Sequence, residues 1–487
     1  MKFKSILEAL KFFSMKTPGK LCLADMDEEV TYSQYYGRIC GTADFLLKKG
    51  IKAGDKVVMS TQQTVGYLTA CHAVQMAGGI FVPLEKNAGT DRVNEIIERT
   101  GAALYIGPEA VDICPRLDAA ALPKLCRDGE PCALPEADGD SMILFTTGTT
   151  GASKGILLTH SSEVAVAENV KYGVEMKENN VEIIPMPMNH SFAIRRYFAD
   201  MINGSTALLL DGTVFVENFF HNYFSKMDEY KATSFAMAPA ALAIILKLSG
   251  DRLGRYGKQL DYIQFGSAPI PETEKKKLLE LLPECRLYNI YGTTEAGCAC
   301  VLNFNSKENR PGCIGRPTVN SKFTFSDENG RIFEAKENRP GCLVCSGGMT
   351  MKGYFNDPGL TKSVMKDGGV YSNDIGYVGG DGLIYLIGRA DDVINTGGNK
   401  IAPGEIEELA NSFPGVAESA CVPVGDPLLG SVPKLFIAAD KEVDTTLLYS
   451  YLSEKLEKYK LPKSIVQIDK LPRTYNGKIW RSKLKEA

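Results

Sequence analysis

The chain of 487 residues lacks several features that mark particular classes of protein. It has one Trp and four His, and its 55 Lys and Arg are outnumbered by 59 Asp and Glu, for a net charge of −4. The absence of a basic surplus argues against nucleic-acid binding. No apolar run is long enough to cross a membrane. The apolar start of the chain is interrupted by Lys2, Lys4, Glu8 and Lys11, which fits an amphipathic helix and not a signal peptide.

Cysteine is present, but the 13 cysteines show no spacing typical of a disulfide framework. Cys342 and Cys345 form a Cys-x-x-Cys pair, and no second pair or nearby His completes four zinc ligands, so core packing is the better interpretation. The scattered thiols predict a reduced protein in the cytoplasm. The length and the apolar content of 44% predict a globular protein of two or more domains.

The order of strand-like and helical segments predicts the fold class. Over the first 106 residues strands, among them those expected at 56–60 and 80–84, alternate with helices. This alternation is typical of a doubly wound, mostly parallel α/β sheet, and it resumes after a connector at 108–140. Short strands and Gly turns at 313–388 predict a small β-rich subdomain. The last hundred residues predict a small α+β domain with helices and strands at 403–411, 417–424, 434–439 and 445–459.

A glycine-rich run crowded with hydroxyl groups follows the apolar residues 142–145; it reads Thr146-Thr147-Gly148-Thr149-Thr150-Gly151-Ala152-Ser153-Lys154-Gly155. Glycines let backbone N–H groups turn toward an anion, while the hydroxyl groups and Lys154 add donors and charge. It is not a Walker A loop, because Ser153 stands where that motif has Gly. The run predicts a polyphosphate loop at the end of a strand. A simple linker is the alternative, and the apolar flanks argue against it.

A second motif, Tyr288-Asn289-Ile290-Tyr291-Gly292-Thr293-Thr294-Glu295, also follows apolar residues. Its aromatic ring can stack on a purine, its hydroxyl group can bind phosphate, and one carboxylate with nucleotide oxygens is a usual Mg²⁺ site. Further motifs are Tyr371-Ser372-Asn373-Asp374, residues 388–392, residues 397–407 and residues 471–478.

Together these motifs resemble, in the same order, those of the adenylate-forming superfamily of acyl- and aryl-CoA ligases, adenylation domains and luciferases. The resemblance runs from about residue 5 to residue 485. The chain departs from the family at Ser153, where the family has Pro, and at Asn373, where it has Gly. Asn tolerates left-handed backbone angles, so the turn expected at Asn373 can persist.

The resemblance implies a role for each motif residue. The phosphates of ATP would bind to Thr146, Thr147, Gly148, Thr149, Thr150, Gly151 and Lys154. Asn289, Tyr291 and Gly292 would contact adenine, Asp374 the ribose hydroxyls, and Arg389 the ribose or phosphate. Thr294 would touch phosphate and Glu295 would bind Mg²⁺, and both count as catalytic.

The C-terminal motifs imply movement. Residues 1–388 would bind acid and ATP, and residues 389–487 would form a mobile lid with its hinge at Asp391. Gly397 and Gly398 would approach a pantetheine arm, and Lys478 would bridge the carboxylate and the α-phosphate, because two anions meet there. The alternatives are a surface ion pair between Arg389 and Asp391 and a solvated Lys478.

The acid would bind at the end of the strand expected at 182–190, which leads into a site. His190 would lie at the acyl pocket, with a catalytic or a structural role. The expected walls are His190, Phe192, Met237, Gly266, Ser267, Ala268 and Thr293. An amino acid substrate is disfavoured, because His190 is followed by Ser191, Phe192 and Ala193 and by no Asp to pair with an ammonium group.

The resemblance therefore implies an ATP-dependent acid–thiol ligase. A small aryl or acyl acid would become acyl-AMP with release of pyrophosphate, and the thiol of coenzyme A would then displace AMP. The first alternative acceptor is the phosphopantetheine of a carrier protein. A non-catalytic nucleotide-binding homologue is a further alternative, which Glu295, Asp374, Arg389 and Lys478 together argue against.

Overall fold

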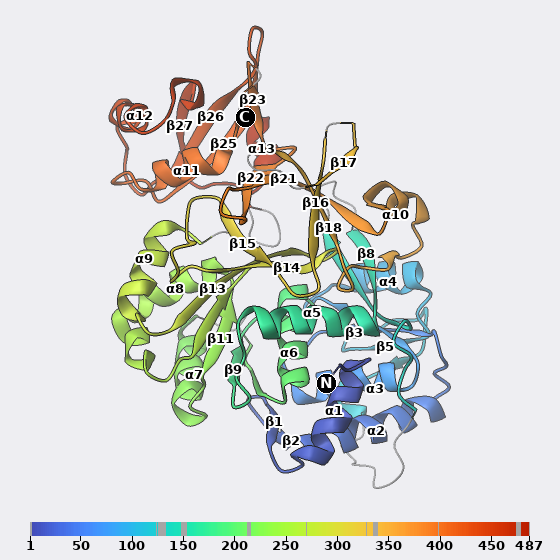
Figure 1. The fold of residues 1–487 in the computed structure, drawn as a ribbon. Coiled ribbons are helices and arrows are strands. Elements are labelled where there is room, and N and C mark those ends of the chain that lie inside the picture. The colour runs from blue at the N-terminus through green and yellow to red at the C-terminus, as the bar shows by residue number, and fades with distance from the viewer. Residues whose placement is uncertain are drawn as a thin grey trace.

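The fold is built on three β-sheets (Figure 1). The chain passes back and forth between the first two sheets and enters the third sheet last. It is a computed structural model that describes residues 2–122, 124, 133–147, 153–211, 216–268, 270–327, 329–334, 339–397, 399–473 and 479–486. None of the helices in this part of the chain combines the length and the apolar character needed to span a bilayer.

The first sheet has seven strands in the order β19-β8-β7-β4-β3-β5-β6. Their bounds are β3 (Lys56–Ser60), β4 (Ile80–Leu84), β5 (Leu104–Ile106), β6 (Arg116–Leu117), β7 (Asp140–Thr147), β8 (Ser153–Thr159) and β19 (Gly353–Tyr354). The side chains alternate between two cores: Val57 packs with the helices α2 (Tyr32–Lys48) and α3 (Val65–Met76), and Val58 with α4 (Thr90–Thr100). The predicted strands at 56–60 and 80–84 and the strand before the phosphate loop are confirmed.

The second sheet is longer and begins as a parallel sheet. Its parallel strands are β1 (Leu21–Ala24), β9 (Val181–Ile184), β10 (Thr206–Leu209), β11 (Ser234–Met237), β12 (Tyr262–Phe265) and β13 (Arg286–Thr293), and β2 (Glu29–Thr31) forms an antiparallel edge. One face is covered by α1 (Ile6–Lys16), α5 (His160–Gly173) and α6 (Ser191–Asn203). The other face is covered by α7 (Val216–Glu229), α8 (Pro239–Ser249), the 3₁₀ helix η2 (Gly250–Tyr256) and α9 (Glu272–Leu281).

The predicted β-rich region continues this second sheet. Its strands are β14 (Gly297–Asn303), β15 (Cys313–Pro317), β16 (Lys322–Ser326), β17 (Ile332–Phe333), β18 (Gly341–Ser346), β20 (Met365–Lys366), β21 (Gly369–Val378) and β22 (Ile384–Arg389), with the helix α10 (Pro358–Val364). Cys345 is buried in this region, as expected for core packing. The turn expected at Asn373 is wrong: this residue lies within the extended strand β21, so Asn needs no left-handed angle there.

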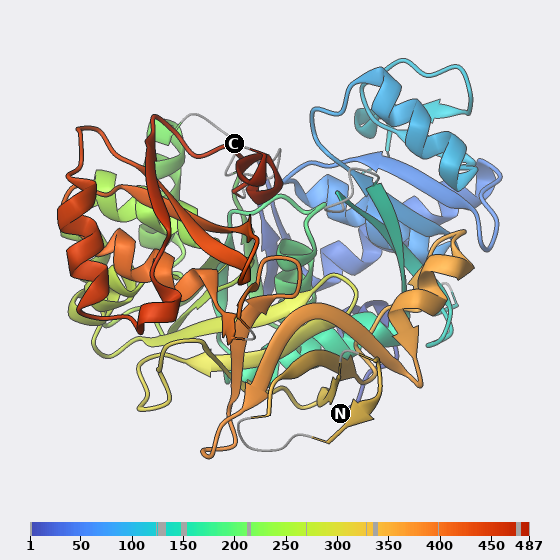
Figure 2. The same cartoon turned by 90° about the horizontal axis from the view of Figure 1, so that it is seen from above.

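The third sheet lies above the other two at the C-terminal end (Figures 1 and 2). It contains β23 (Ile394–Thr396), β24 (Asn399–Ile401), β25 (Glu418–Asp426), β26 (Gly430–Ala438) and β27 (Ser464–Ile468), with α11 (Pro403–Asn411), α12 (Thr445–Ser453), the 3₁₀ helix η3 (Lys458–Lys460) and α13 (Arg481–Lys485). The predicted helix at 403–411 is confirmed, while the helix predicted at 445–459 ends at Ser453. The hairpin β23–β24 was not predicted. The α/β fold class with a smaller C-terminal α+β part is thus confirmed.

Candidate active site

The turn that carries Thr294 and Glu295 joins the antiparallel strands β13 and β14. A Cβ atom on Gly292 would lie 2.1 Å from the carbonyl oxygen of Gly297, so the approach of these two strands requires glycine at position 292. The Thr293 hydroxyl accepts a hydrogen bond from the backbone N–H of Ala296 at 3.0 Å. The turn is therefore tight, and it fixes the backbone position from which the Glu295 side chain extends.

Arg195 on α6 binds the backbone of this turn. It is only 9% exposed, and its guanidinium group donates to the carbonyl oxygens of Thr293 at 2.9 Å and Thr294 at 2.8 Å. Burial lowers the pKa of Arg195 to about 10, so the group stays charged at neutral pH. The hydroxyl groups of Ser191 and Thr294 add a contact of 3.2 Å. Sequence reasoning missed Arg195, because α6 also carries Arg196 and Asp200 and its sequence does not show which charged residue reaches the turn.

Tyr291 and Asp374 come together although 83 residues separate them. The Tyr291 hydroxyl donates to Asp374 Oδ2 at 2.7 Å, and burial, followed by the nearby Asp374 charge, raises the pKa of Tyr291 well above its usual value. Arg389 is the ladder partner of Asp374 across β21 and β22. Asn289 and Gly292 flank Tyr291 on β13. The structure thus brings five residues predicted to bind the nucleotide into one place.

The predicted phosphate loop is described only at its two ends. Thr146 and the backbone of Thr147 end β7, and Lys154 lies at the start of β8. Gly148, Thr149, Thr150 and Gly151 lie outside the described residues. The Lys154 ammonium is 5.7 Å from the centroid of the Tyr354 ring. Ser153 binds to α4: its hydroxyl accepts from Arg92 at 3.0 Å and its carbonyl oxygen from Arg99 at 2.7 Å.

The expected acyl-pocket residues gather at the N-terminus of α6, with one exception. His190 is exposed and caps the helix, because its Nδ1 accepts from the backbone N–H of Phe192 at 3.3 Å. A Cβ atom on Gly266 would lie 3.1 Å from the Phe192 ring, so the ring lies against that glycine. Ser267 and Ala268 are exposed next to Gly266, and Ser267 has a left-handed φ of 70°.

Met237 is the exception, and its assignment to the pocket wall is corrected. Its side chain is fully buried in the core formed with α7 and α8, on the face of the sheet opposite α6. Side chains alternate along a strand, and this alternation directs Met237 away from Phe192.

A buried polar cluster lies one turn further along α6 on the Phe192 side. Arg196 is fully buried and donates through Nε to Glu182 at 2.6 Å and through Nη2 to the Tyr262 hydroxyl at 2.6 Å. Gln264 also accepts from Arg196. These groups satisfy one another, as buried charges must. The cluster joins α6 to the strands β9 and β12.

The residues that lead to the C-terminal sheet are more exposed. Arg389 and Asp391 are exposed, and Asp391 pairs with the Asn373 side chain. Both are described, and they form no ion pair with each other, which removes that alternative. Lys485 donates to the backbone carbonyl of Asp391 at 2.8 Å.

Gly397 lies directly after β23, in the turn that leads to β24, and has a left-handed φ of 56°. Gly398 and Lys478 lie outside the described residues.

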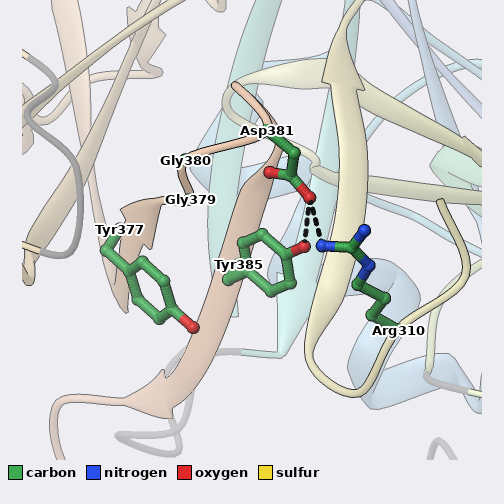
Figure 3. A pocket seen from close by; sticks show the side chains of 6 residues that line it. All are labelled: Arg310, Tyr377, Gly379, Gly380, Asp381 and Tyr385. Carbon is green, nitrogen blue, oxygen red and sulfur yellow. Dashed lines mark hydrogen bonds and ion pairs between the residues drawn. The ribbon is translucent and has the colours of Figure 1, made fainter.

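A surface hollow of about 450 Å³ lies at the other end of the β21–β22 hairpin (Figure 3). Its walls are Arg310, Tyr377, Gly379, Gly380, Asp381 and Tyr385. Asp381 accepts from Tyr385 at 2.7 Å and from Arg310 at 3.0 Å, so its charge is already neutralised. The hollow contains none of the predicted site residues.

Comparisons with known proteins agree with this geometry. The AMP-binding enzyme family matches residues 11–355, and the AMP-binding enzyme C-terminal domain family matches residues 405–478. The chain is 26% identical over 494 residues to the 2-succinylbenzoate–CoA ligase of Bacillus cereus (strain AH820), covering 98% of this chain and 97% of that protein. It is 28% identical over 469 residues to a feruloyl-CoA synthase of Amycolatopsis sp., covering 94% and 93% of the two chains.

Solved structures share the fold. The o-succinylbenzoate CoA synthetase of Bacillus subtilis in complex with its acyl-adenylate has a TM-score of 0.86 at 24% identity, covering 98% of both chains. ATP-bound MatB of Rhodopseudomonas palustris has a TM-score of 0.87 at 22% identity, covering 100% of this chain and 99% of the other. The predicted family and enzyme class are thereby confirmed: the chain belongs to the AMP-binding, adenylate-forming enzymes, as an AMP-forming acid–thiol ligase.

Proposed function

We propose that this chain activates a small carboxylic acid with ATP and transfers the acyl group to the thiol of coenzyme A. The observation that carries the proposal is the meeting of Tyr291, Asp374 and Arg389 beside the turn that holds Thr294 and Glu295. These residues come from distant segments, and together they offer an aromatic ring, a ribose acceptor, a cation and a carboxylate in one place. A packing role alone gives no reason for that combination.

In the first step a carboxylate oxygen attacks the α-phosphorus, the bond to the β-phosphate oxygen breaks, and pyrophosphate leaves. Tyr291 would stack on adenine while Asp374 accepts from the ribose hydroxyls. Lys154 and the loop at 148–151 would hold the leaving phosphates. Lys478 would bridge the two reacting anions, and binding in line supplies much of the rate.

Glu295 fits the role of a magnesium ligand. Its carboxylate is half-buried, follows the Thr294 hydroxyl and has one oxygen engaged by Tyr354, which leaves the other for a cation. One carboxylate together with nucleotide oxygens is a usual Mg²⁺ environment, and the ion would neutralise phosphate charge. A relative, the o-succinylbenzoate synthetase of Bacillus subtilis, has been solved with ATP and a magnesium ion.

In the second step the thiol attacks the acyl carbonyl and AMP leaves. The residues after 389 would rotate about Asp391 and bring Gly397 and Gly398 to the pantetheine arm. Coenzyme A is the proposed acceptor because the relatives at 26–28% identity are named as CoA ligases. The phosphopantetheine of a carrier protein is the second candidate, favoured only by the similarity of such loops between the two enzyme classes. A cytoplasmic location remains part of the proposal, supported by the free thiols of the described cysteines.

The acid is proposed to be a non-amino acid, with aryl acids tested first. The relative named for 2-succinylbenzoate acts on a benzoic acid derivative. The start of α6 carries His190, Ser191, Phe192 and Ala193 and no carboxylate, so an ammonium group would find no partner among these residues.

The test is a panel of aryl, short-chain and amino acids in an ATP–pyrophosphate exchange assay. We expect exchange with one or more aryl or acyl acids, and loss of exchange in Glu295→Gln. The best acid is then offered with CoA and, separately, with a phosphopantetheinylated carrier protein. Acylation of the carrier alone would reject the proposed acceptor, and exchange that proceeds equally with Glu295→Gln would reject the metal ligand.

A further inference from the structure

Tyr354 lies between the two charged residues that the proposed function places on the phosphates. Its hydroxyl group donates to Glu295 Oε1 at 2.9 Å. On the other side, the Lys154 ammonium faces the ring of the same tyrosine, 5.7 Å from its centroid. Tyr354 is 7% exposed, while Lys154 and Glu295 are half-buried.

Backbone contacts also hold the segments of Lys154 and Glu295 close to the strand that carries Tyr354. Strand β19 pairs with β8, and Tyr354 is the ladder partner of Ile156, two residues after Lys154. The backbone N–H of Met351 donates to the carbonyl oxygen of Glu295 at 2.8 Å. The backbone N–H of Tyr354 donates to the hydroxyl group of Thr361 on α10 at 2.8 Å. The ring therefore has a defined position relative to the phosphate loop and to the β13–β14 turn.

This arrangement addresses an electrostatic problem. A lysine and a glutamate close together in a partly buried site attract each other strongly, and a direct pair would occupy both groups. Lys154 and Glu295 are both described, and they form no ion pair with each other. A tyrosine satisfies both charges without joining them, since its ring face attracts a cation and its hydroxyl group donates to an anion.

The hydroxyl group also orients the carboxylate. With Oε1 engaged by Tyr354, Oε2 is the oxygen that remains for a metal ion. Groups that hydrogen-bond to a metal's carboxylate ligands orient those ligands, and their loss typically costs ~10–100-fold in metal affinity or activity. A tyrosine that served packing alone could donate its hydroxyl group to any acceptor, whereas Tyr354 donates to the proposed metal ligand.

We propose that Tyr354 is a positioning residue that aims the Glu295 carboxylate at the metal of Mg·ATP and keeps Lys154 available for the phosphates. The inference rests on the proposed function, because it takes Glu295 as a metal ligand. It assigns the two contacts of one side chain to two different tasks, and two substitutions separate them.

The experiment measures binding and not turnover. Mn²⁺ replaces Mg²⁺, and electron paramagnetic resonance gives the affinity of the protein–ATP complex for Mn²⁺; calorimetry gives ATP affinity without metal. Tyr354→Phe keeps the ring beside Lys154 and removes only the donor. We expect Mn²⁺ affinity to fall by ~10-fold or more and metal-free ATP affinity to change less than about twofold. Tyr354→Leu removes the ring too, and metal-free ATP affinity should also fall.

Tyr385→Phe is the matched control. Tyr385 is also 7% exposed and also donates to a carboxylate, Asp381 at 2.7 Å, but it lies outside the site (Figure 3). It should leave both affinities unchanged, and thermal unfolding shows that each variant is folded. Unchanged Mn²⁺ affinity in Tyr354→Phe, with a clear loss in Glu295→Gln, would overturn the positioning role and leave the metal ligand in place. Unchanged Mn²⁺ affinity in Glu295→Gln would overturn both.

Discussion

The turn at 293–295 and the segment at 389–397 carry residues for the same reaction, but they are held very differently. The turn is fastened by the buried Arg195, by Ser191 and by Tyr354, with four hydrogen bonds between 2.8 and 3.2 Å. In the second segment Arg389 and Asp391 are exposed, and the partners of Asp391 are the half-buried Asn373 and the exposed Lys485. Leu428, in the turn between β25 and β26, is 93% exposed. Groups that stabilise phosphate charge need fixed positions, whereas a segment that rotates must not be tied down. The difference in fastening thus matches the difference in proposed task.

The largest expected effect tests the C-terminal part, which is proposed to rotate. Lys478→Ala should lower acyl-AMP formation from acid and ATP by ~10²-fold or more, because its ammonium group is the proposed bridge between the two anions. The same variant given synthetic acyl-AMP and thiol should form thioester at close to the normal rate. Lys483→Ala, an exposed lysine on the neighbouring helix, is the control. Equal loss of both half-reactions would identify Lys478 as a structural tie and weaken the comparison.

A second effect concerns the buried network behind α6. Glu163 is 2% exposed and accepts a hydrogen bond from the Ser141 hydroxyl at 2.8 Å. The side chain of Gln75 donates to Glu163 and also hydrogen-bonds to His72. The other ring nitrogen of His72 lies 2.8 Å from the hydroxyl group of Tyr197 on α6. Burial raises the pKa of Glu163 to about 8. An acid that is protonated when folded and ionised when unfolded makes the protein less stable as pH rises between its two pKa values.

Glu163→Gln should therefore remove this loss between about pH 4.5 and pH 8 and stabilise the protein by on the order of 2–3 kcal/mol at pH 7. The measurement is urea unfolding at several pH values, with Glu168→Gln, a half-exposed residue of the same helix, as control. A slope of stability against pH that is unchanged in Glu163→Gln would show that this carboxyl is ionised in the fold.

The third effect breaks the fastening of the turn. A lysine at position 195 keeps the charge but can bond one carbonyl oxygen well and not two in a fixed fork. Arg195→Lys should lower the rate of ATP–pyrophosphate exchange by ~10-fold, about the value of one hydrogen bond to a charged group. Arg310→Lys, whose guanidinium group pairs with the surface residue Asp381, should have little effect. Equal exchange rates in the two variants would mean that the turn holds its shape without Arg195.

Several of these contacts could not be read from the sequence. The strands at 56–60 and 80–84 were predictable because short apolar runs between turn residues leave few alternatives, and the motif residues 288–295 were recognisable by their order. Arg195 and Tyr354 were missed because their partners are backbone oxygens and a residue 59 positions away, which no local pattern encodes. Met237 was misplaced because a strand end does not show which face its side chain takes. The turn assumed at Asn373 came from the family's Gly, whereas the strand pairing of β21 decides the backbone there.

The fourth effect tests the second segment, through the exposed Leu428 beside the glycine loop at Gly397. Leu429 lies next to Gly397, whose backbone N–H donates to the Leu429 carbonyl at 2.9 Å, so the exposed Leu428 and the glycine loop share one tip. If this tip meets the first domain only for thioester formation, Leu428→Asp should slow that step several-fold and leave adenylation unchanged. Leu447→Asp, 59% exposed on α12, is the control. Slower adenylation in Leu428→Asp would contradict the division of tasks.

The smallest effect is expected at the departure from the family pattern. Ser153→Pro removes the hydroxyl that accepts from Arg92 but keeps the carbonyl oxygen that accepts from Arg99. Proline is tolerated at the first residue of a strand, and Ser153 is the first residue of β8. Arg92 also retains Glu95 at 2.8 Å as a partner. The KM for ATP should change by less than about twofold, because the lost bond ties the loop to α4 and is a half-exposed contact of small net value. A KM that rises far more than this would place the Ser153 hydroxyl or N–H among the phosphate ligands, and the start of β8 would then belong to the catalytic loop.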